Sequence, residues 1–227
     1  MTICLVTDRR QLSPDARTVR DEASALSGWL EQAIAAGVDL IQLRERDLPA
    51  RLLADLTRRV SRVAAGSGTR VVVNDRADVA IACGCDGVHL RGDGPPVARM
   101  RGVVARSGSY DRDPRSFLIG RSVHSAEEAQ THADADYLVF GAVFDSGSKP
   151  GLGLAALRNA AANSVGVIAI GGITIARASE CIAAGASGVA AIRLFLPPGR
   201  AVGGLGVGEA TRQLRAAFDA AATGHLQ

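Results

Sequence analysis

Two adjacent glycines, Gly171 and Gly172, follow a short run of β-branched and small apolar residues at positions 167–170. The run is typical of a buried strand, and the paired glycines accept backbone angles that are closed to other residues. With no Cβ in the way, successive N–H groups at the start of the following helix can converge on an anion, and phosphate is the commonest one. The stretch predicts a phosphate-binding loop, with a plain turn as the alternative.

Polar residues capable of chemistry recur just after the other apolar runs. They are Gln42, Arg44 and Arg46 after the second run, Asn74 and Asp75 after the third, Ser122 and His124 after the fifth, Ser148 and Lys149 after the sixth, and Arg193 after the eighth. Imidazole exchanges protons near neutral pH, so His124 is the candidate general acid-base, the alternative being a cap on the helix that begins near Ser125. Asp75 is suited either to ligand or metal binding or to capping the next helix.

An alternation of strand and helix patterns must position these residues. Strand patterns cover residues 3–7, 38–43, 70–74, 87–90, 117–120, 137–140, 167–170 and 188–192. Helical patterns cover residues 29–36, 50–65, 77–83, 97–105, 126–133, 154–162, 175–184 and 209–222. This order predicts a (β/α)₈ TIM barrel, one domain over residues 1–227, with a doubly wound sheet as the alternative. In such a barrel the working residues lie where strands end, as the polar residues above do.

The segments that connect these elements carry expectations of their own. Residues 14–25 are predicted to be a polar connection, residues 107–116 a loop, and residues 225–227 a frayed tail. The glycine- and proline-rich residues 197–208 are either a lid over the site or a plain connection.

Composition narrows the class of protein. Hydrophobic residues make up 47% of the chain, and the net charge of +3 suits small anionic substrates. No apolar run is long enough to cross a bilayer, and the N-terminus lacks the pattern of a secretory signal. Aromatic residues make up only 4%, which argues against a nucleic-acid surface. The four cysteines are expected to be buried thiols in a reducing compartment. We therefore expect a cytoplasmic protein with neither a membrane nor a nucleic-acid partner.

Several of these motifs together resemble the thiamin-phosphate synthase superfamily, in order from Leu5 to about Leu194. The matching stretches are Gln42-Leu43-Arg44-Glu45-Arg46, Asn74-Asp75-Arg76, Gly87-Val88-His89-Leu90, Gly120-Arg121-Ser122-Val123-His124-Ser125, Asp136-Tyr137 through Phe144, Lys149 and Ala169-Ile170-Gly171-Gly172-Ile173. The resemblance implies a TIM-barrel core over residues 3–194 with a closing helix at 209–222, a phosphorylated thiazole as substrate, and a homodimer.

The superfamily holds two activities, and departures from its synthase pattern bear on the choice. Thiamin-phosphate synthase joins a pyrimidine diphosphate to thiazole phosphate with Mg²⁺, using two aspartates and a threonine-rich loop. Here the fourth strand continues as Arg91-Gly92-Asp93-Gly94-Pro95-Pro96, which lacks the usual glycine-glutamine and displaces the second acid. Asp145-Ser146-Gly147-Ser148 replaces the threonines, Arg46 replaces a lysine, and Arg193 replaces a serine.

These departures, and the likeness of residues 120–129 and 134–144 to the TenI-like branch, favour a cofactor-free thiazole tautomerase. The resemblance then implies His124 as the acid-base and Gln42, Arg44 and Lys149 as holders of the carboxylate or ring. It assigns the phosphate to Gly171, Gly172, Ile192 and Arg193. The first alternative is the synthase, which requires Mg²⁺ and Asp75, and retention of Asn74 and Asp75 supports it. The second is a barrel that binds phosphorylated thiazole without catalysis.

Overall fold

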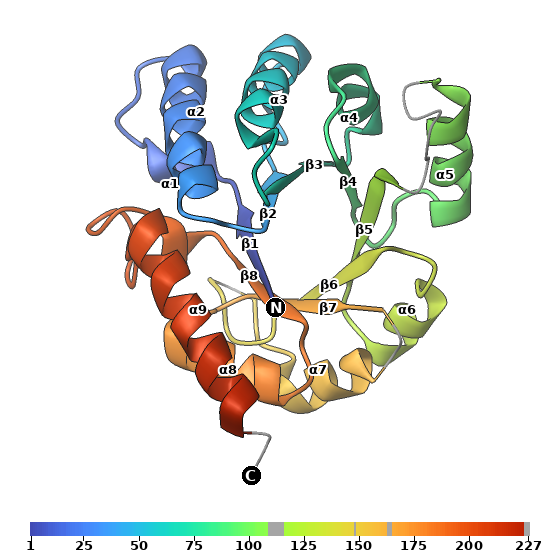
Figure 1. Cartoon of the computed structure of the whole chain (residues 1–227), viewed down its shortest axis with the longest axis vertical. Coiled ribbons are helices and arrows are strands. Elements are labelled where there is room, and N and C mark those ends of the chain that lie inside the picture. Colours follow the sequence, from blue (N-terminus) through green and yellow to red (C-terminus); the bar gives the residue numbers. More distant parts are fainter. Residues whose placement is uncertain (109–115, 148, 163–164, 225–227) are drawn as a thin grey trace.

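The computed structural model describes residues 1–108, 116–147, 149–162 and 165–224 and contains a closed barrel of parallel strands (Figure 1). The strands are β1 (Thr2–Val6), β2 (Leu40–Leu43), β3 (Arg70–Asn74), β4 (Gly87–Leu90), β5 (Leu118–Val123), β6 (Tyr137–Gly141), β7 (Val167–Ile170) and β8 (Gly188–Ala191). Each strand pairs with its sequence neighbours, and β8 closes on β1 with Val189 opposite Ile3. The expected (β/α)₈ barrel is confirmed.

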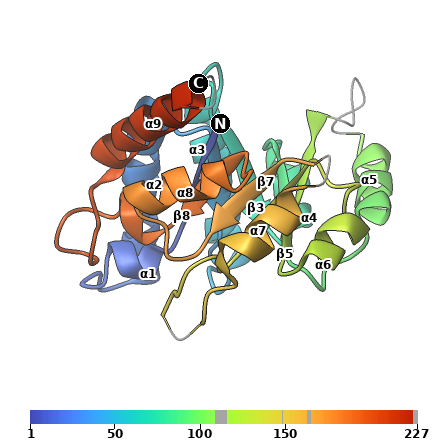
Figure 2. The same cartoon turned by 90° about the horizontal axis from the view of Figure 1, so that it is seen from below.

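Helices surround the strands (Figure 1). They are α1 (Arg9–Leu12), α2 (Val19–Ala35), α3 (Ala50–Ala64), α4 (Ala77–Cys83), α5 (Val97–Arg106), α6 (Ala126–Thr131), α7 (Gly153–Ala161), α8 (Ile175–Ala183), the 3-10 helix η2 (Arg193–Phe195) and α9 (Val207–Gly224). Figure 2 shows the N-terminus at one end of the barrel, and α1 and the connection from β6 to α7 at the opposite end. Within the described residues, no helix has the length and apolar character needed to cross a membrane.

The alternation of side chains along each strand explains both the core and the site. On β1, Ile3 and Leu5 face the helices and belong to the large outer core, whereas Cys4 and Val6 belong to a smaller cluster inside the barrel. The inner cluster also takes Leu40, Val72, Val139, Ile168 and Ala190. Side chains two residues apart share a face of a strand. Residues two positions beyond these therefore point into the barrel mouth.

The prediction was wrong where the chain leaves β1. Residues 14–25 were expected to be a polar connection, but α2 begins at Val19. The cause is a capping box, in which the Thr18 hydroxyl accepts from the Asp21 N–H and the Asp21 carboxylate accepts from the Thr18 N–H. Elsewhere the differences are small: β5 runs on to Val123, and α9 spans Val207–Gly224 where residues 209–222 were expected.

Candidate active site

A cavity of about 600 Å³ opens where the strands end, and it contains almost all of the predicted site residues. Its lining includes Gln42, Arg44, Arg46, Asn74, Ser122, His124, Lys149, Gly171, Gly172, Ile192 and Arg193. Two predicted residues stand apart. Ser148 lies outside the described residues, and Asp75 is next to the cavity without lining it.

A chain of amide and carboxylate groups crosses from β2 to β4. Gln42 Nε2 donates to Asn74 Oδ1 at 2.8 Å, and Asn74 Nδ2 donates to Asp75 Oδ2 at 3.0 Å. The second oxygen of Asp75 accepts from the Arg91 N–H at 3.0 Å, and Asp75 has a φ of 58°, in the left-handed region. Asp75 does not cap α4, whose N-cap residue Arg76 makes no side-chain capping bond. Its carboxylate therefore ties the loop after β3 to the loop after β4.

His89 lies on the cavity floor as a neutral hydrogen-bonding group. Its Nε2 is 2.9 Å from the Ser122 hydroxyl, and its Nδ1 is 3.2 Å from the Tyr137 hydroxyl. Burial, reinforced by the charges of Arg121 and Arg44, lowers the pKa of His89 to about 3. The ring is thus uncharged at neutral pH and orients the Ser122 hydroxyl toward the cavity.

His124 lies at the exposed rim of the cavity. Its Nδ1 is 2.5 Å from the Gly141 carbonyl oxygen, and its backbone N–H donates to Glu128 Oε2 at 2.7 Å. A carbonyl only accepts hydrogen bonds, so Nδ1 carries the proton and Nε2 is the acceptor in the neutral ring. The helix that follows is capped by Ser125, whose hydroxyl accepts from the Glu128 N–H.

The two glycines after β7 have the backbone that the sequence predicted. Gly171 has a φ of 99° and Gly172 a φ of 64°, and a Cβ on Gly171 would lie 2.6 Å from the Ala142 Cα atom. Arg177, in the first turn of α8, donates from NH1 to the Gly172 carbonyl at 2.9 Å. Its guanidinium also stacks 4.6 Å from the centre of the Phe144 ring. Arg177 therefore braces the glycine loop against the segment that follows β6.

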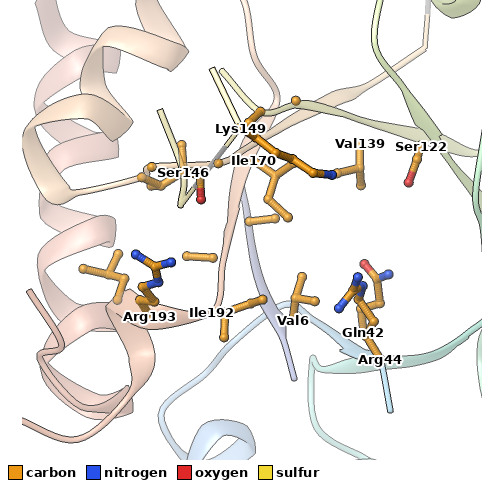
Figure 3. Close-up of a pocket in the computed structure, with 18 of the residues that line it drawn as sticks. Val6, Gln42, Arg44, Ser122, Val139, Ser146, Lys149, Ile170, Ile192 and Arg193 are labelled. Carbon is orange, nitrogen blue, oxygen red and sulfur yellow. The ribbon is translucent and has the colours of Figure 1, made fainter. Parts of the chain in front are cut away.

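The segment after β6 carries Lys149, the only lysine in the chain. Ser146 and Lys149 exchange two backbone hydrogen bonds, of 3.0 and 3.2 Å, and Asp145 accepts from the Gly151 N–H at 2.7 Å. Figure 3 shows the Lys149 amine directed toward Val139 and Ser122. In a chain that otherwise uses arginine, the backbone of this single lysine is held at the cavity by its hydrogen bonds to Ser146.

Positive charge dominates the cavity. Among the lining residues that the structure describes, the acidic one is Asp145, and the cations are Arg44, Arg46, Arg91, Lys149, Arg177 and Arg193. Figure 3 shows Gln42 and Arg44 on one side and Arg193 and Ser146 on the other, with Lys149 between them. Burial lowers the pKa of Arg44, yet a guanidinium stays charged at neutral pH. The cavity therefore carries positive charge on both of its sides.

A buried ion-pair network supports the loop that carries Arg44 and Arg46. The intervening Glu45 accepts from Arg9 NH1 at 3.0 Å and from the Arg9 N–H at 3.1 Å. Arg9 also pairs with Glu22 at 2.7 Å and with Asp47 at 2.8 Å. Burial raises the pKa of Glu45, although its hydrogen bonds to Arg9 oppose the shift.

Arg91 and Arg177 were missed as site residues from the sequence. A signal for Arg177 exists, because it falls in the first turn of the helix that follows the paired glycines, where a cation can meet a phosphate. For Lys149 the stronger signal was its uniqueness among 26 basic residues. Arg91 departs from the superfamily pattern, and that departure alone did not show where its side chain would lie.

Comparisons with known proteins identify the family of this chain and several similar proteins. The family profile described as thiamine monophosphate synthase matches residues 16–195. A thiamine-phosphate synthase of Methanoculleus marisnigri is 44% identical over 74% of this chain and 78% of its own length. One from Methanoregula boonei is 43% identical over 70% of this chain and 73% of its own. A solved thiamine phosphate pyrophosphorylase from Pyrococcus furiosus superposes with a TM-score of 0.77 at 28% identity, covering 97% of this chain and 96% of that one.

These relatives overturn the expectation of a thiazole tautomerase, because they bear the name of the other activity in the superfamily. The tautomerase prediction gave too much weight to the missing second acid after β4 and to His124. Asn74 and Asp75, which the resemblance associates with the synthase, form one continuous hydrogen-bonded chain with Gln42 in the structure. The chain belongs to the thiamine monophosphate synthase family.

Proposed function

We propose that this protein is a thiamine-phosphate synthase, a transferase that joins a hydroxymethylpyrimidine diphosphate to thiazole phosphate. The observation that best supports this proposal is the cavity, which has cationic side chains at two ends and Lys149 between them. The ring nitrogen of the thiazole attacks the methylene carbon of the pyrimidine. A C–N bond forms, the C–O bond to the diphosphate breaks, and its electron pair leaves with pyrophosphate. Both substrates and the leaving group are anions, which suits this lining.

The pyrimidine and its diphosphate are assigned to the side formed by β2 to β5. Gln42 and Asn74 carry amide groups at the cavity wall, and Ser122 is oriented by His89 from below. Such groups form directional hydrogen bonds with the amino group and nitrogens of a pyrimidine. Arg44, Arg46 and Lys149 supply positive charge where the diphosphate separates, and Ser148 is assigned to the same loop. Stabilising charge that develops on a leaving group lowers the barrier directly.

The thiazole phosphate is assigned to the side formed by β7 and β8. Gly171 and Gly172 line the cavity just before α8 begins, and Ile192 and Arg193 complete the wall. A helix N-terminus with an arginine beside it is a favourable phosphate site. His124 lies at the rim and has no assigned step in this reaction.

Asp75, which lies next to the cavity, is the carboxylate that would hold a magnesium ion arriving with the substrate. Asp75 accepts two hydrogen bonds, and each carboxylate oxygen keeps a further lone pair. Mg²⁺ is usually held by one or two carboxylates together with substrate phosphates and water. Among the described residues, no cluster of three acidic, imidazole or thiol groups is preformed for a metal. Such an ion, when bound, would neutralise charge on the diphosphate.

The direct test incubates the purified protein with hydroxymethylpyrimidine diphosphate, thiazole phosphate and Mg²⁺. Thiamin phosphate and pyrophosphate are expected in equal amounts, and neither when one substrate is omitted. Lys149→Gln should lower turnover at least tenfold, whereas Arg158→Gln, an exposed position on α7, should leave it unchanged. Pyrophosphate release that is absent, or independent of thiazole phosphate, would overturn the proposed function.

Because Lys149 is the only lysine, reductive ¹³C-methylation labels one side chain besides the N-terminal amine. Its NMR signal should shift when the pyrimidine diphosphate is added. An unmoved signal at saturating ligand would remove Lys149 from the assigned site.

A further inference from the structure

The loop between β4 and α5 is held from below by a buried arginine. Arg121 is 3% exposed, and its NH1 donates to the Pro95 carbonyl at 2.7 Å. Its NH2 donates to the carbonyls of Gly92 at 2.7 Å and Gly94 at 2.8 Å. Hydrogen bonds from a charged donor are stronger than those between neutral groups, so three of them on one short loop fix its path.

The first residue of this loop is Arg91, and its backbone is fixed as well. Its N–H donates to Asp75 at 3.0 Å, and its carbonyl accepts from the Gly94 N–H at 2.9 Å. The Arg91 side chain is 62% exposed, lines the cavity, and forms an ion pair from Nε to Asp93 at 2.7 Å. The planar guanidinium has five N–H donors, and Asp93 contacts it at Nε.

The placement of charge at this end of the cavity is distinctive. The second aspartate that the superfamily pattern expects after β4 is displaced to Asp93, whose side chain is 77% exposed and pairs with Arg91. Asp93 does not line the cavity, whereas Arg91 does. The loop thus presents a cation at the cavity, and the acid that the superfamily pattern expects there lies outside it.

We propose that Arg91 binds the diphosphate of the pyrimidine substrate and the departing pyrophosphate directly, and that Arg121 is the positioning residue that fixes its loop. This inference rests on the proposed synthase function. As the C–O bond breaks, negative charge grows on the diphosphate, and the Arg91 guanidinium at the rim stabilises it through hydrogen bonds. Arg91 takes over part of the neutralisation that the displaced acid and its metal would provide.

The test compares wild type, Arg91→Ala, Arg91→Lys and the control Arg99→Ala by calorimetric titration with pyrophosphate, with Mg²⁺ and with EDTA. Arg99 is exposed on α5 and does not line the cavity. We expect wild type to bind pyrophosphate in EDTA, Arg91→Ala to bind it about tenfold more weakly in both buffers, and Arg91→Lys to recover part of the loss. Thiazole phosphate affinity should be unchanged in all four proteins.

The role of Arg121 is tested by a double-mutant cycle. Arg121→Gln should weaken pyrophosphate binding in the wild-type background and add no further loss in Arg91→Ala, with thiazole phosphate affinity preserved. A general loosening of the fold would instead lower both affinities in both backgrounds, which would overturn the positioning role.

Failure of this inference is distinguishable from failure of the proposed function. If wild type makes thiamin phosphate but Arg91→Ala binds pyrophosphate equally well, the assignment of Arg91 is wrong and the synthase proposal stands. If wild type binds no pyrophosphate in either buffer, the inference is also overturned. If wild type forms no product from the two substrates, the proposed function itself falls.

Discussion

Replacing Arg9 by methionine should destabilise the barrel strongly, because it leaves the buried Glu45 carboxylate without its charged partner and without access to water. The side chains of Arg9 and Glu45 are 3% and 2% exposed, whereas the other partners, Glu22 and Asp47, are 17% and 47% exposed. Removing one partner of a buried ion pair costs about 3–5 kcal/mol, and exposed pairs contribute at most about 1 kcal/mol. Nearly all of the expected loss therefore comes from Glu45.

The assay is urea unfolding followed by circular dichroism at pH 7. For a domain of this size a loss of about 3–5 kcal/mol corresponds to a melting temperature roughly 6–20 °C lower. The double variant Arg9→Met/Glu45→Gln should regain at least about 1 kcal/mol, because no buried charge is left unpaired. The control is Arg10→Met, whose side chain is 67% exposed and pairs with the same Asp47.

The pH dependence follows from the sign of the Glu45 shift. Burial raises its pKa, and loss of Arg9 raises it further, so the folded state of Arg9→Met binds the proton more tightly than the unfolded state. The deficit should be largest above this raised pKa and shrink as the pH falls toward about 4.3, the ordinary glutamate value. A deficit below about 1 kcal/mol, equal to that of Arg10→Met, or growing on acidification, would refute the reasoning.

Three further predictions concern the barrel interior and the phosphate end. Because the folded-state pKa of His89 is lowered to about 3, its contribution to the free energy of unfolding is complete above pH 6.5. That contribution is lost as the pH falls below 6.5, by about 2–3 kcal/mol at pH 4.5. Urea unfolding should show a flatter dependence of stability on pH for His89→Asn, and identical slopes would contradict the buried neutral ring. Gly120→Ala places a Cβ 2.0 Å from the Tyr137 Cζ atom and should lower stability by about 1–3 kcal/mol. At Gly28 a Cβ would meet no atom within 4 Å, so Gly28→Ala should raise stability slightly. Equal effects of the two substitutions in thermal unfolding would argue against the crowding at Gly120. In steady-state kinetics, Arg177→Ala should raise the KM for thiazole phosphate about tenfold, equivalent to about 1.4 kcal/mol, and leave the KM for the pyrimidine diphosphate unchanged. A rise in both KM values would remove the assignment of Arg177 to the phosphate end.

The sequence by itself was sufficient for the architecture and for much of the cavity wall. Eight strand-helix units imply a closed barrel, and a period of two along each strand carries Gln42, Asn74, Ser122 and Ile192 inward once the apolar residues before them are placed in the core. The paired glycines indicated the loop after β7, because glycine accepts a positive φ where a Cβ would press against Ala142. These are local rules, so a single chain reveals them.

Only the tertiary structure decided what the polar groups do. The start of α2 at Val19 depends on a local capping box and was therefore predictable in principle from the sequence. The hydrogen bonds from Arg91 to Asp75, and from Arg121 to the loop after β4, instead join residues that are 16 and 26–29 positions apart. The sequence shows that a glutamate stands between Arg44 and Arg46. It does not show that this glutamate turns toward Arg9, 36 residues earlier, because side-chain pairing across neighbouring loops is set by how the barrel closes.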